Sequence, residues 1–124
     1  MDGSRRAEIG RLGEGYAAAD LMKKGYAILE RNYHSRYGEI DIIAADAEYI
    51  VFVEVRVRAL GGLTDPGETL TRQKQQKIVK TAMVYLMDHE GALQPRFDFY
   101  AIGTKGRQIV AAEHLEDAFQ AFAF

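Results

Sequence analysis

The stretch that most constrains the fold runs from residue 38 to residue 58 and reads GEIDIIAADAEYIVFVEVRVR. Side chains alternate between the two faces of a β-strand. In the second half of this stretch the valines 51, 53, 55 and 57 share one face, whereas Phe52, Glu54 and Arg56 share the other. Apolar residues also alternate with acids in the first half. We therefore predict a β-hairpin whose valines face the protein core.

The position of the turn decides which residues of the two strands face each other. A four-residue loop over residues 46–49 pairs residues whose numbers sum to 95, which places Asp41 opposite Glu54. Facing like charges destabilise a sheet by up to about 1 kcal/mol, and their β-carbons lie roughly 5 Å apart. Two such carboxylates can share one Mg²⁺ ion. The hairpin alone leaves two interpretations open: a metal site, or acids on a solvated face with a cross-strand ion pair between Glu39 and Arg56.

Bulk composition bounds the class of protein. The length of 124 residues and a hydrophobic fraction of 48% favour a single globular domain over residues 1–124. The net charge of −2 argues against indiscriminate nucleic-acid binding, so any such binding needs a local basic patch. No run approaches the roughly 20 apolar residues of a membrane helix, and the N-terminus lacks the apolar part of a secretory signal. The chain has no cysteine and only three separated histidines. We expect a cytoplasmic protein without membrane contact, disulfides or a thiolate zinc site.

Periodicity along the rest of the chain predicts alternating helices and strands. Gly25 is the expected C-cap of the first helix, and Thr69 or Thr71 the expected N-cap of the second. A Gly-rich loop over 59–68 precedes that second helix. The predicted elements are a helix over 4–24, a strand over 26–33, the hairpin 38–58, a helix over 68–88, strands over 96–103 and 107–112, and a helix over 113–124.

Polar residues on the two long helices have competing interpretations. Glu14 lies in line with small and apolar residues, which is typical of a site acid or of a solvated helix edge. Lys74 interrupts an apolar stripe, where a lysine can also extend past its neighbours into solvent. Asp98 is either a further site acid or a charge at a sheet edge. The segment 56–80 also contains a local basic patch, although the net charge of the chain is negative: Arg56, Arg58, Arg72, Lys74, Lys77 and Lys80. For Lys77 and Lys80 a solvated helix face is the alternative interpretation.

Taken together, these motifs resemble a known family. The segments GEGYAAADLMKKGYAILERNY, GEIDIIA, FVEVRVR and RFDF are similar to the YraN family of uncharacterised bacterial proteins, often described as predicted endonucleases. That family is likened to archaeal Holliday-junction resolvases, and the order acid, acid, Glu-x-basic resembles the PD-(D/E)XK nuclease superfamily. The resemblance covers roughly residues 8–121. It implies a restriction-endonuclease-like α/β fold of three layers, with helices on a central mixed sheet in the order α-β-β-β-α-β-β-α.

The resemblance also implies roles for individual residues. Asp41 and Glu54 become ligands of Mg²⁺ or Mn²⁺, with the Val55 carbonyl as a third ligand. Glu14 becomes an accessory acid, and Lys74 a contact to phosphate. Arg56 stands where the family pattern has lysine, and arginine cannot act as a general base because it stays protonated. In this interpretation the basic residues Arg58, Arg72, Lys77 and Lys80 contact the nucleic-acid backbone.

Three functions remain open at this point. The first is a metal-dependent endonuclease acting on DNA, including branched DNA. The second is a module that binds nucleic acid but cleaves it weakly or not at all, because Arg56 replaces the lysine. The third is a protein-interaction domain, suggested by the acidic net charge and by the C-terminal phenylalanines Phe119, Phe122 and Phe124. These phenylalanines are either ordinary core residues, the default interpretation, or the contact surface of a homodimer.

Overall fold

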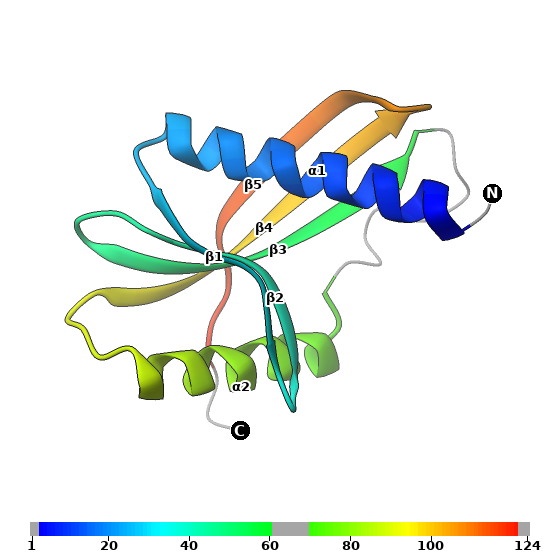
Figure 1. The fold of residues 1–124 in the computed structure, drawn as a ribbon. Helices are drawn as coiled ribbons and strands as arrows, with labels where there is room; N and C mark the ends of the chain where they lie inside the picture. The colour runs from blue at the N-terminus through cyan, green and yellow to red at the C-terminus, as the bar shows by residue number, and fades with distance from the viewer. Residues whose placement is uncertain (1–2, 61–69, 122–124) are drawn as a thin grey trace.

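A computed structural model describes residues 3–60 and 70–121 of the chain (Figure 1). Within these residues two helices and five strands follow one another in the order α-β-β-β-α-β-β. The helices are α1 (Gly3–Lys23) and α2 (Arg72–Asp88). The strands are β1 (Ala27–Ser35), β2 (Gly38–Ala45), β3 (Tyr49–Ala59), β4 (Gln94–Lys105) and β5 (Gln108–Phe119).

The strands form a single mixed sheet in the order β1-β2-β3-β4-β5. Among the described strands β3 and β4 run parallel, and the other neighbouring strands are antiparallel. A parallel pair requires a long crossover connection, and here that connection contains α2. Helix α1 covers one face of the sheet and α2 covers the other (Figure 1). The predicted α/β class, with a mixed sheet between two helical layers, is confirmed.

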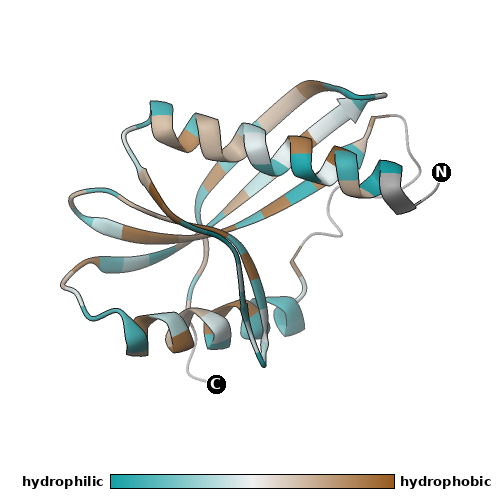
Figure 2. Ribbon diagram, viewed as in Figure 1, coloured by the Kyte–Doolittle hydropathy of each residue, from teal (hydrophilic) through white to brown (hydrophobic). Residues whose placement is uncertain are grey.

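Two hydrophobic clusters hold these layers together. On one face, Ala17 and Leu21 of α1 pack over Val51, Val53 and Val55, so that the predicted inward face of the valines is confirmed. On the other face, Ile78, Ala82 and Tyr85 of α2 pack over Ile50, Phe52 and Phe97. The hydropathy of the chain agrees with this packing. Apolar positions concentrate on the strands, whereas the helices alternate between apolar and polar positions (Figure 2).

The end of α1 and the beginning of α2 lie where the sequence predicts them. Gly25 has a φ of +97°, and its N–H donates to the Met22 carbonyl at 3.1 Å while the Tyr26 N–H donates to the Leu21 carbonyl at 3.0 Å. These two bonds are those of a Schellman C-cap, which favours glycine. The N-cap of α2 is Thr71, whose side chain accepts from the Lys74 N–H at 3.2 Å. The alternative cap Thr69 and most of the predicted loop lie outside the described residues.

The predicted helix over residues 113–124 is wrong. Strand β5 continues to Phe119 and pairs with β4, including the pairs Leu115 with Phe99 and Phe119 with Phe97. The reason is tertiary, since an isolated short helix would leave the main-chain groups along this edge of β4 unpaired. Phe119 is buried and its ring stacks on Phe97 with centroids 5.0 Å apart, so it belongs to the core. Phe122 and Phe124 lie outside the described residues.

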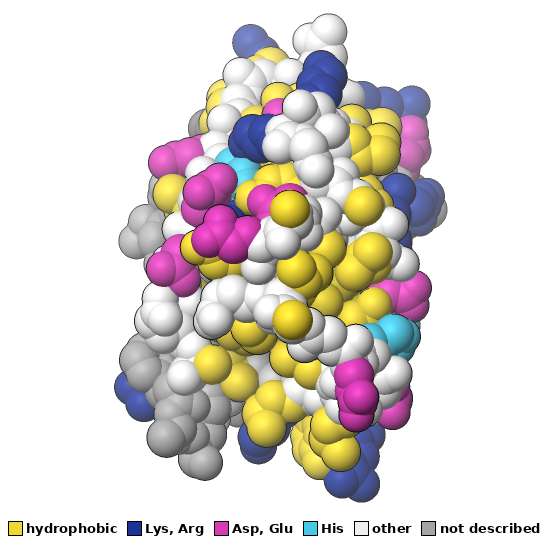
Figure 3. Space-filling model, turned by 90° about the vertical axis from the view of Figure 1, so that its left-hand side faces the viewer, with side chains coloured by type: hydrophobic (Ala, Val, Ile, Leu, Met, Phe, Trp, Pro, Cys, Tyr) yellow, Lys and Arg dark blue, Asp and Glu magenta, His cyan; other side chains and the backbone are white. Residues whose placement is uncertain are grey.

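Side-chain types are unevenly distributed over the surface. Figure 3 shows the side of the molecule that carries the connections α1–β1, β2–β3 and α2–β4, and hydrophobic and acidic side chains dominate its centre. Basic side chains lie mainly near its margins (Figure 3). No helix in the described part of the chain is long and apolar enough to span a bilayer.

Candidate functional site

The hairpin of β2 and β3 has the predicted register. Its paired residues, from Ile42 with Val53 to Ala45 with Ile50, all have numbers that sum to 95. Asp46 closes the turn, because its N–H donates to the Tyr49 carbonyl at 3.0 Å and its Oδ1 accepts from the N–H groups of Glu48 and Tyr49. The next pair in this register is Asp41 with Glu54. The regular pairing ends just before it, so β2 leaves β3 at these two acids.

Asp41 lies where the alternation of β2 breaks. Ile42 packs on the α1 side of the sheet, whereas Ile40, two residues away, packs on the α2 side. On the neighbouring strand Asn32 has a φ of +54°, a left-handed conformation that is uncommon without glycine. The regular pairing of β1 with β2 skips the position of Asn32 and Asp41. As a result, the Asp41 carboxylate turns toward the main chain of β3, and its Oδ2 accepts from the Val55 N–H at 2.7 Å.

The carboxyl group of Glu54 joins Asp41 at this opening. Burial, the hydrogen bond to Asp41 and the charge of Asp41 raise the pKa of Glu54 to about 9, and the guanidinium of Arg56 acts in the opposite direction. Burial beside a second carboxyl group thus favours the protonated form of Glu54, whose hydroxyl donates in the hydrogen bond to Asp41. The predicted proximity of Asp41, Glu54 and Arg56 is confirmed by these interactions.

Glu14 reaches the same opening from α1. Burial, followed by the charge of Asp41, raises the pKa of Glu14, while Arg31 and a hydrogen bond from Asn32 lower it. Gly13, the preceding residue, allows this approach, because a Cβ added to it would overlap Cγ2 of Val57 on β3. Glu39 adds a weaker negative influence on both Glu14 and Glu54. The site thus concentrates carboxyl groups.

Because each interrupts an apolar stripe, Glu14 and Lys74 are both expected on the sheet face of Glu54, opposite the valines. This expectation is wrong: α1, which carries Glu14, packs on the valine face, and the opposite face is covered by α2 with Lys74. Lys74 lies in the first turn of α2. An apolar stripe identifies the buried side of a helix but does not say which face of the sheet the helix covers. The Lys74 side chain is exposed and forms no ion pair with a described residue.

The other predicted basic residues lie on β3 and α2. Arg58 is half-buried near the end of β3, and Arg72 begins α2. Lys77 and Lys80 are exposed on α2, beside the turn between β1 and β2. Sequence reasoning missed the contribution of that turn, where Arg36 and Tyr37 extend the basic surface. The tripeptide Arg36-Tyr37-Gly38, a basic and an aromatic residue next to a glycine, was the available signal.

Asp98 belongs to a separate buried network. It is fully buried and forms a bidentate ion pair with Arg96 through two hydrogen bonds of 2.9 Å. The same carboxylate also bonds to Nε2 of His114 at 2.7 Å and accepts from the Asp117 N–H at 3.0 Å. These bonds outweigh burial and lower the pKa of Asp98. Asp98 is therefore neither a further acid of the site at Asp41 and Glu54 nor a charge at a sheet edge. It is a buried acid paired with Arg96 and His114.

Within residues 3–60 and 70–121, no three or more His, Cys, Asp or Glu side chains are grouped as a ready metal site. The acid pair supplies two side-chain ligand groups, and a main-chain carbonyl can supply a third. Val55 has such a carbonyl at this opening. Its N–H points to Asp41, and the N–H and C=O of one strand residue point to the same neighbouring strand.

Fold and site together define a three-layer α/β protein with a hydrogen-bonded acid pair where two strands of its sheet separate. Residues 13–102 match the uncharacterised protein family UPF0102, and the chain belongs to this family. It is 43% identical over 120 residues to a UPF0102 protein of Prosthecochloris aestuarii. This alignment covers 92% of this chain and 94% of that protein. A UPF0102 protein of Carboxydothermus hydrogenoformans is 46% identical over 103 residues, covering 81% of this chain and 86% of the relative.

Proposed function

We propose that the protein is a Mg²⁺- or Mn²⁺-dependent endonuclease that hydrolyses phosphodiester bonds of DNA, with branched DNA among its substrates. The observation that carries this proposal is the meeting of the Asp41 and Glu54 carboxyl groups at the opening between β2 and β3. The motifs that resemble the PD-(D/E)XK superfamily support the same proposal, because they assign the metal to these two acids.

The donors at the opening fit a small divalent cation. Mg²⁺ takes oxygen ligands and is commonly held by one or two carboxylates together with waters and substrate phosphates. Asp41, Glu54 and the Val55 carbonyl would hold the ion. When bound, it would lower the pKa of a coordinated water and polarise the scissile phosphate.

The remaining side chains have separate roles around the phosphate. Arg56 stays protonated, so it offsets negative charge on the transferring phosphoryl group rather than accepting a proton. Glu14 is the better proton acceptor, because burial and Asp41 raise its pKa above that of an ordinary glutamate. It would orient the attacking water and take its proton. Lys74 and the basic residues of β3 and α2 would contact the phosphates that flank the cleavage site.

The decisive experiment incubates the purified protein with labelled linear duplex, single-stranded, flapped and four-way-junction DNA, with Mg²⁺, with Mn²⁺ and with EDTA. We expect metal-dependent cleavage that Glu54→Gln abolishes. Glu113→Gln, which removes an exposed acid of β5, is the matched control and should cleave as the wild type does. Absence of cleavage on every substrate, or cleavage unaffected by Glu54→Gln, would contradict the proposal.

Arg56 supports a second candidate function, a module that holds nucleic acid without cutting it. It lies next to Glu54 and favours the charged form of that acid, yet it cannot serve as a base. Arg56→Lys separates the two candidates. A gain of cleavage in this variant, from an inactive wild type that binds DNA, would favour the binding module.

A further inference from the structure

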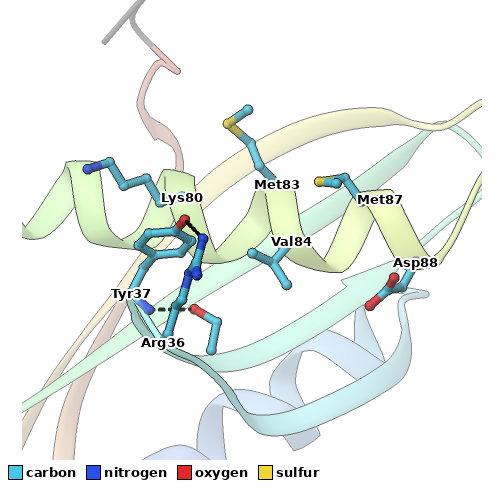
Figure 4. A pocket seen from close by; sticks show the side chains of 8 residues that line it. Arg36, Tyr37, Lys80, Met83, Val84, Met87 and Asp88 are labelled. Atoms are coloured by element: carbon cyan, nitrogen blue, oxygen red, sulfur yellow. Dashed lines mark hydrogen bonds between the residues drawn. The ribbon is translucent and has the colours of Figure 1, made fainter.

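A groove lies between the β1–β2 turn and the exposed side of α2, and neither Asp41 nor Glu54 lines it. Its cavity volume is about 690 Å³, within the range of roughly 300–1,000 Å³ typical of small-molecule sites. Figure 4 shows the turn residues on one side and the helix side chains on the other. The lining residues are Ser35, Arg36, Tyr37, Lys80, Met83, Val84, Met87 and Asp88.

One end of the groove is cationic. The Arg36 guanidinium lies 4.9 Å from the centre of the Tyr37 ring and donates to its hydroxyl at 2.7 Å, and the Lys80 ammonium lies 5.8 Å from the same ring (Figure 4). Neither cation forms an ion pair with a described residue. The positive charges of Arg36 and Lys80 lie beside the same ring and repel each other, so an anion bound between them would be stabilised.

The rest of the groove is apolar until its far end. Met83 and Met87 are 58% and 78% exposed, and Val84 lies between them as a half-buried floor (Figure 4). Thioethers adapt their shape to flat or irregular apolar ligands. Asp88 closes the groove, eight residues after Lys80 and therefore about 12 Å further along the helix. The groove thus runs from a cationic end over an apolar floor to a hydrogen-bond acceptor.

The walls of the groove are held in place by contacts within the protein. Ser35 Oγ lies 2.9 Å from Oγ1 of the fully buried Thr81 and accepts from the Tyr37 N–H at 3.0 Å. Gly38 has a φ of +153°, and a Cβ added there would lie 3.5 Å from Cβ of Lys77, so the turn packs closely against α2. A preformed site avoids much of the ordering cost of binding.

We infer that this groove binds an unpaired nucleotide of a DNA strand, with a phosphate between Arg36 and Lys80 and the base on Met83, Val84 and Met87. The Asp88 carboxylate then accepts from an exocyclic amino group of the base. A peptide carboxylate would satisfy the cations but would not bring a flat apolar body to the floor. In duplex DNA the bases are paired and stacked, so an unpaired segment fits the groove better.

This inference rests on the proposed nuclease function and narrows its substrate. Gly38 and Asp41 are three residues apart on β2, which spans about 10 Å in an extended strand. An unpaired strand held in the groove therefore lies within a few nucleotides of the acid pair. The substrate class that follows is DNA in which a single-stranded segment adjoins a duplex, such as a flap or a fork.

The test measures binding by fluorescence anisotropy in EDTA, so that no cleavage intervenes. The probes are a labelled single-stranded oligonucleotide, the corresponding blunt duplex and a polyglutamate peptide. For Arg36→Ala/Lys80→Ala we expect at least tenfold weaker binding of the single strand. The slope of log K against log salt should fall by about 1.4, since each phosphate contact on a single strand contributes roughly 0.7. Arg11→Ala/Lys23→Ala, which removes two exposed charges from α1, is the control and should change neither value.

The apolar floor is tested separately from the charges. Met83→Gln/Met87→Gln should weaken single-strand binding severalfold without changing its salt slope, because stacking rather than charge is lost. Met22→Gln is the matched control, since Met22 on α1 is also 58% exposed. Circular dichroism and thermal unfolding should be unchanged in all these variants, because the substituted side chains are exposed.

Failure of this inference differs from failure of the nuclease proposal. Unchanged single-strand binding in the groove variants, or tighter binding of polyglutamate than of DNA through the same residues, would overturn the inference. Glu54→Gln should retain full single-strand binding, because that substitution leaves the groove untouched. A protein that binds single strands through the groove but cleaves no DNA would support the groove and contradict only the nuclease.

Discussion

The main-chain N–H of Val55 donates a hydrogen bond of 2.7 Å to Oδ2 of Asp41. In a regular antiparallel pair this N–H would meet a carbonyl of β2. Here the side chain of Asp41 takes that place, because the regular pairing of β2 with β3 begins only at Ile42. One hydrogen bond thus closes the end of the ladder and fixes a carboxylate beside Glu54.

The metal proposal predicts a specific stabilisation. Mg²⁺ or Mn²⁺ should raise the unfolding temperature of the wild type, because a ligand that binds only the folded state stabilises it, by about 2.7 kcal/mol at a hundredfold excess over Kd. The shift should be smaller at pH 6 than at pH 8, since the proton on Glu54 competes with the cation. Differential scanning fluorimetry measures this. Glu54→Gln should lose most of the shift, and Glu113→Gln should keep it; equal shifts in both would argue against Glu54 as a ligand.

The buried network around Asp98 predicts a large loss of stability. Asp98→Asn removes the buried charged partner of the Arg96 guanidinium and leaves only the exposed Glu116 carboxylate, at 3.9 Å. Breaking a buried ion pair in this way costs about 3–5 kcal/mol. Urea denaturation at pH 7 measures the change in the free energy of unfolding. Asp88→Asn, at an exposed position, is the control and should shift it by less than about 0.5 kcal/mol. A small effect of Asp98→Asn would show that the pair is not needed for stability.

The same residue predicts part of the acid sensitivity. The pKa of Asp98 is lowered from its ordinary 3.8 by the hydrogen bonds from His114 and Arg96, which outweigh burial. A depressed folded-state pKa adds stability above the unfolded-state value, and this stability is lost as the pH falls through the folded-state value. The urea concentration at the unfolding midpoint of the wild type should therefore decrease as the pH is lowered below about 4. The fall should be shallower in Asp98→Asn, and an equally steep fall would assign the acid sensitivity to other groups.

Two glycines of α1, Gly10 and Gly13, should change stability in opposite directions when replaced by alanine. Gly13→Ala should destabilise the protein by about 1–3 kcal/mol, because the added Cβ overlaps Val57. Gly10→Ala should stabilise it by up to about 1 kcal/mol, because no atom lies within 4 Å of the added Cβ and alanine favours the helix. Urea denaturation of both variants tests this, and stabilisation by Gly13→Ala would contradict the close packing of α1 on β3.

Local rules were sufficient for much of the fold and for the centre of the site. Two features fix the hairpin register. The turn at Asp46 sets which residues face each other, and a shift of one residue would move the apolar side chains to the other face. The caps at Gly25 and Thr71 follow from the chemistry of helix ends. The turn fixes the register, so the amino-acid sequence brings Asp41 and Glu54 to facing positions. The direction of the Asp41 carboxylate, toward the Val55 N–H, depends on the irregular backbone beside Asn32.

Contacts between distant parts of the chain decided the rest. Residues 113–119 form a strand because the free edge of β4 needs hydrogen-bonding partners, which the pattern of β5 alone does not reveal. Lys74 lies on the face opposite α1 because α2 crosses from β3 to the parallel β4. Asp98 meets Arg96 and His114 only after β4 and β5 pair. Sequence periodicity reports which side of an element is buried, whereas its partners depend on how the elements pack.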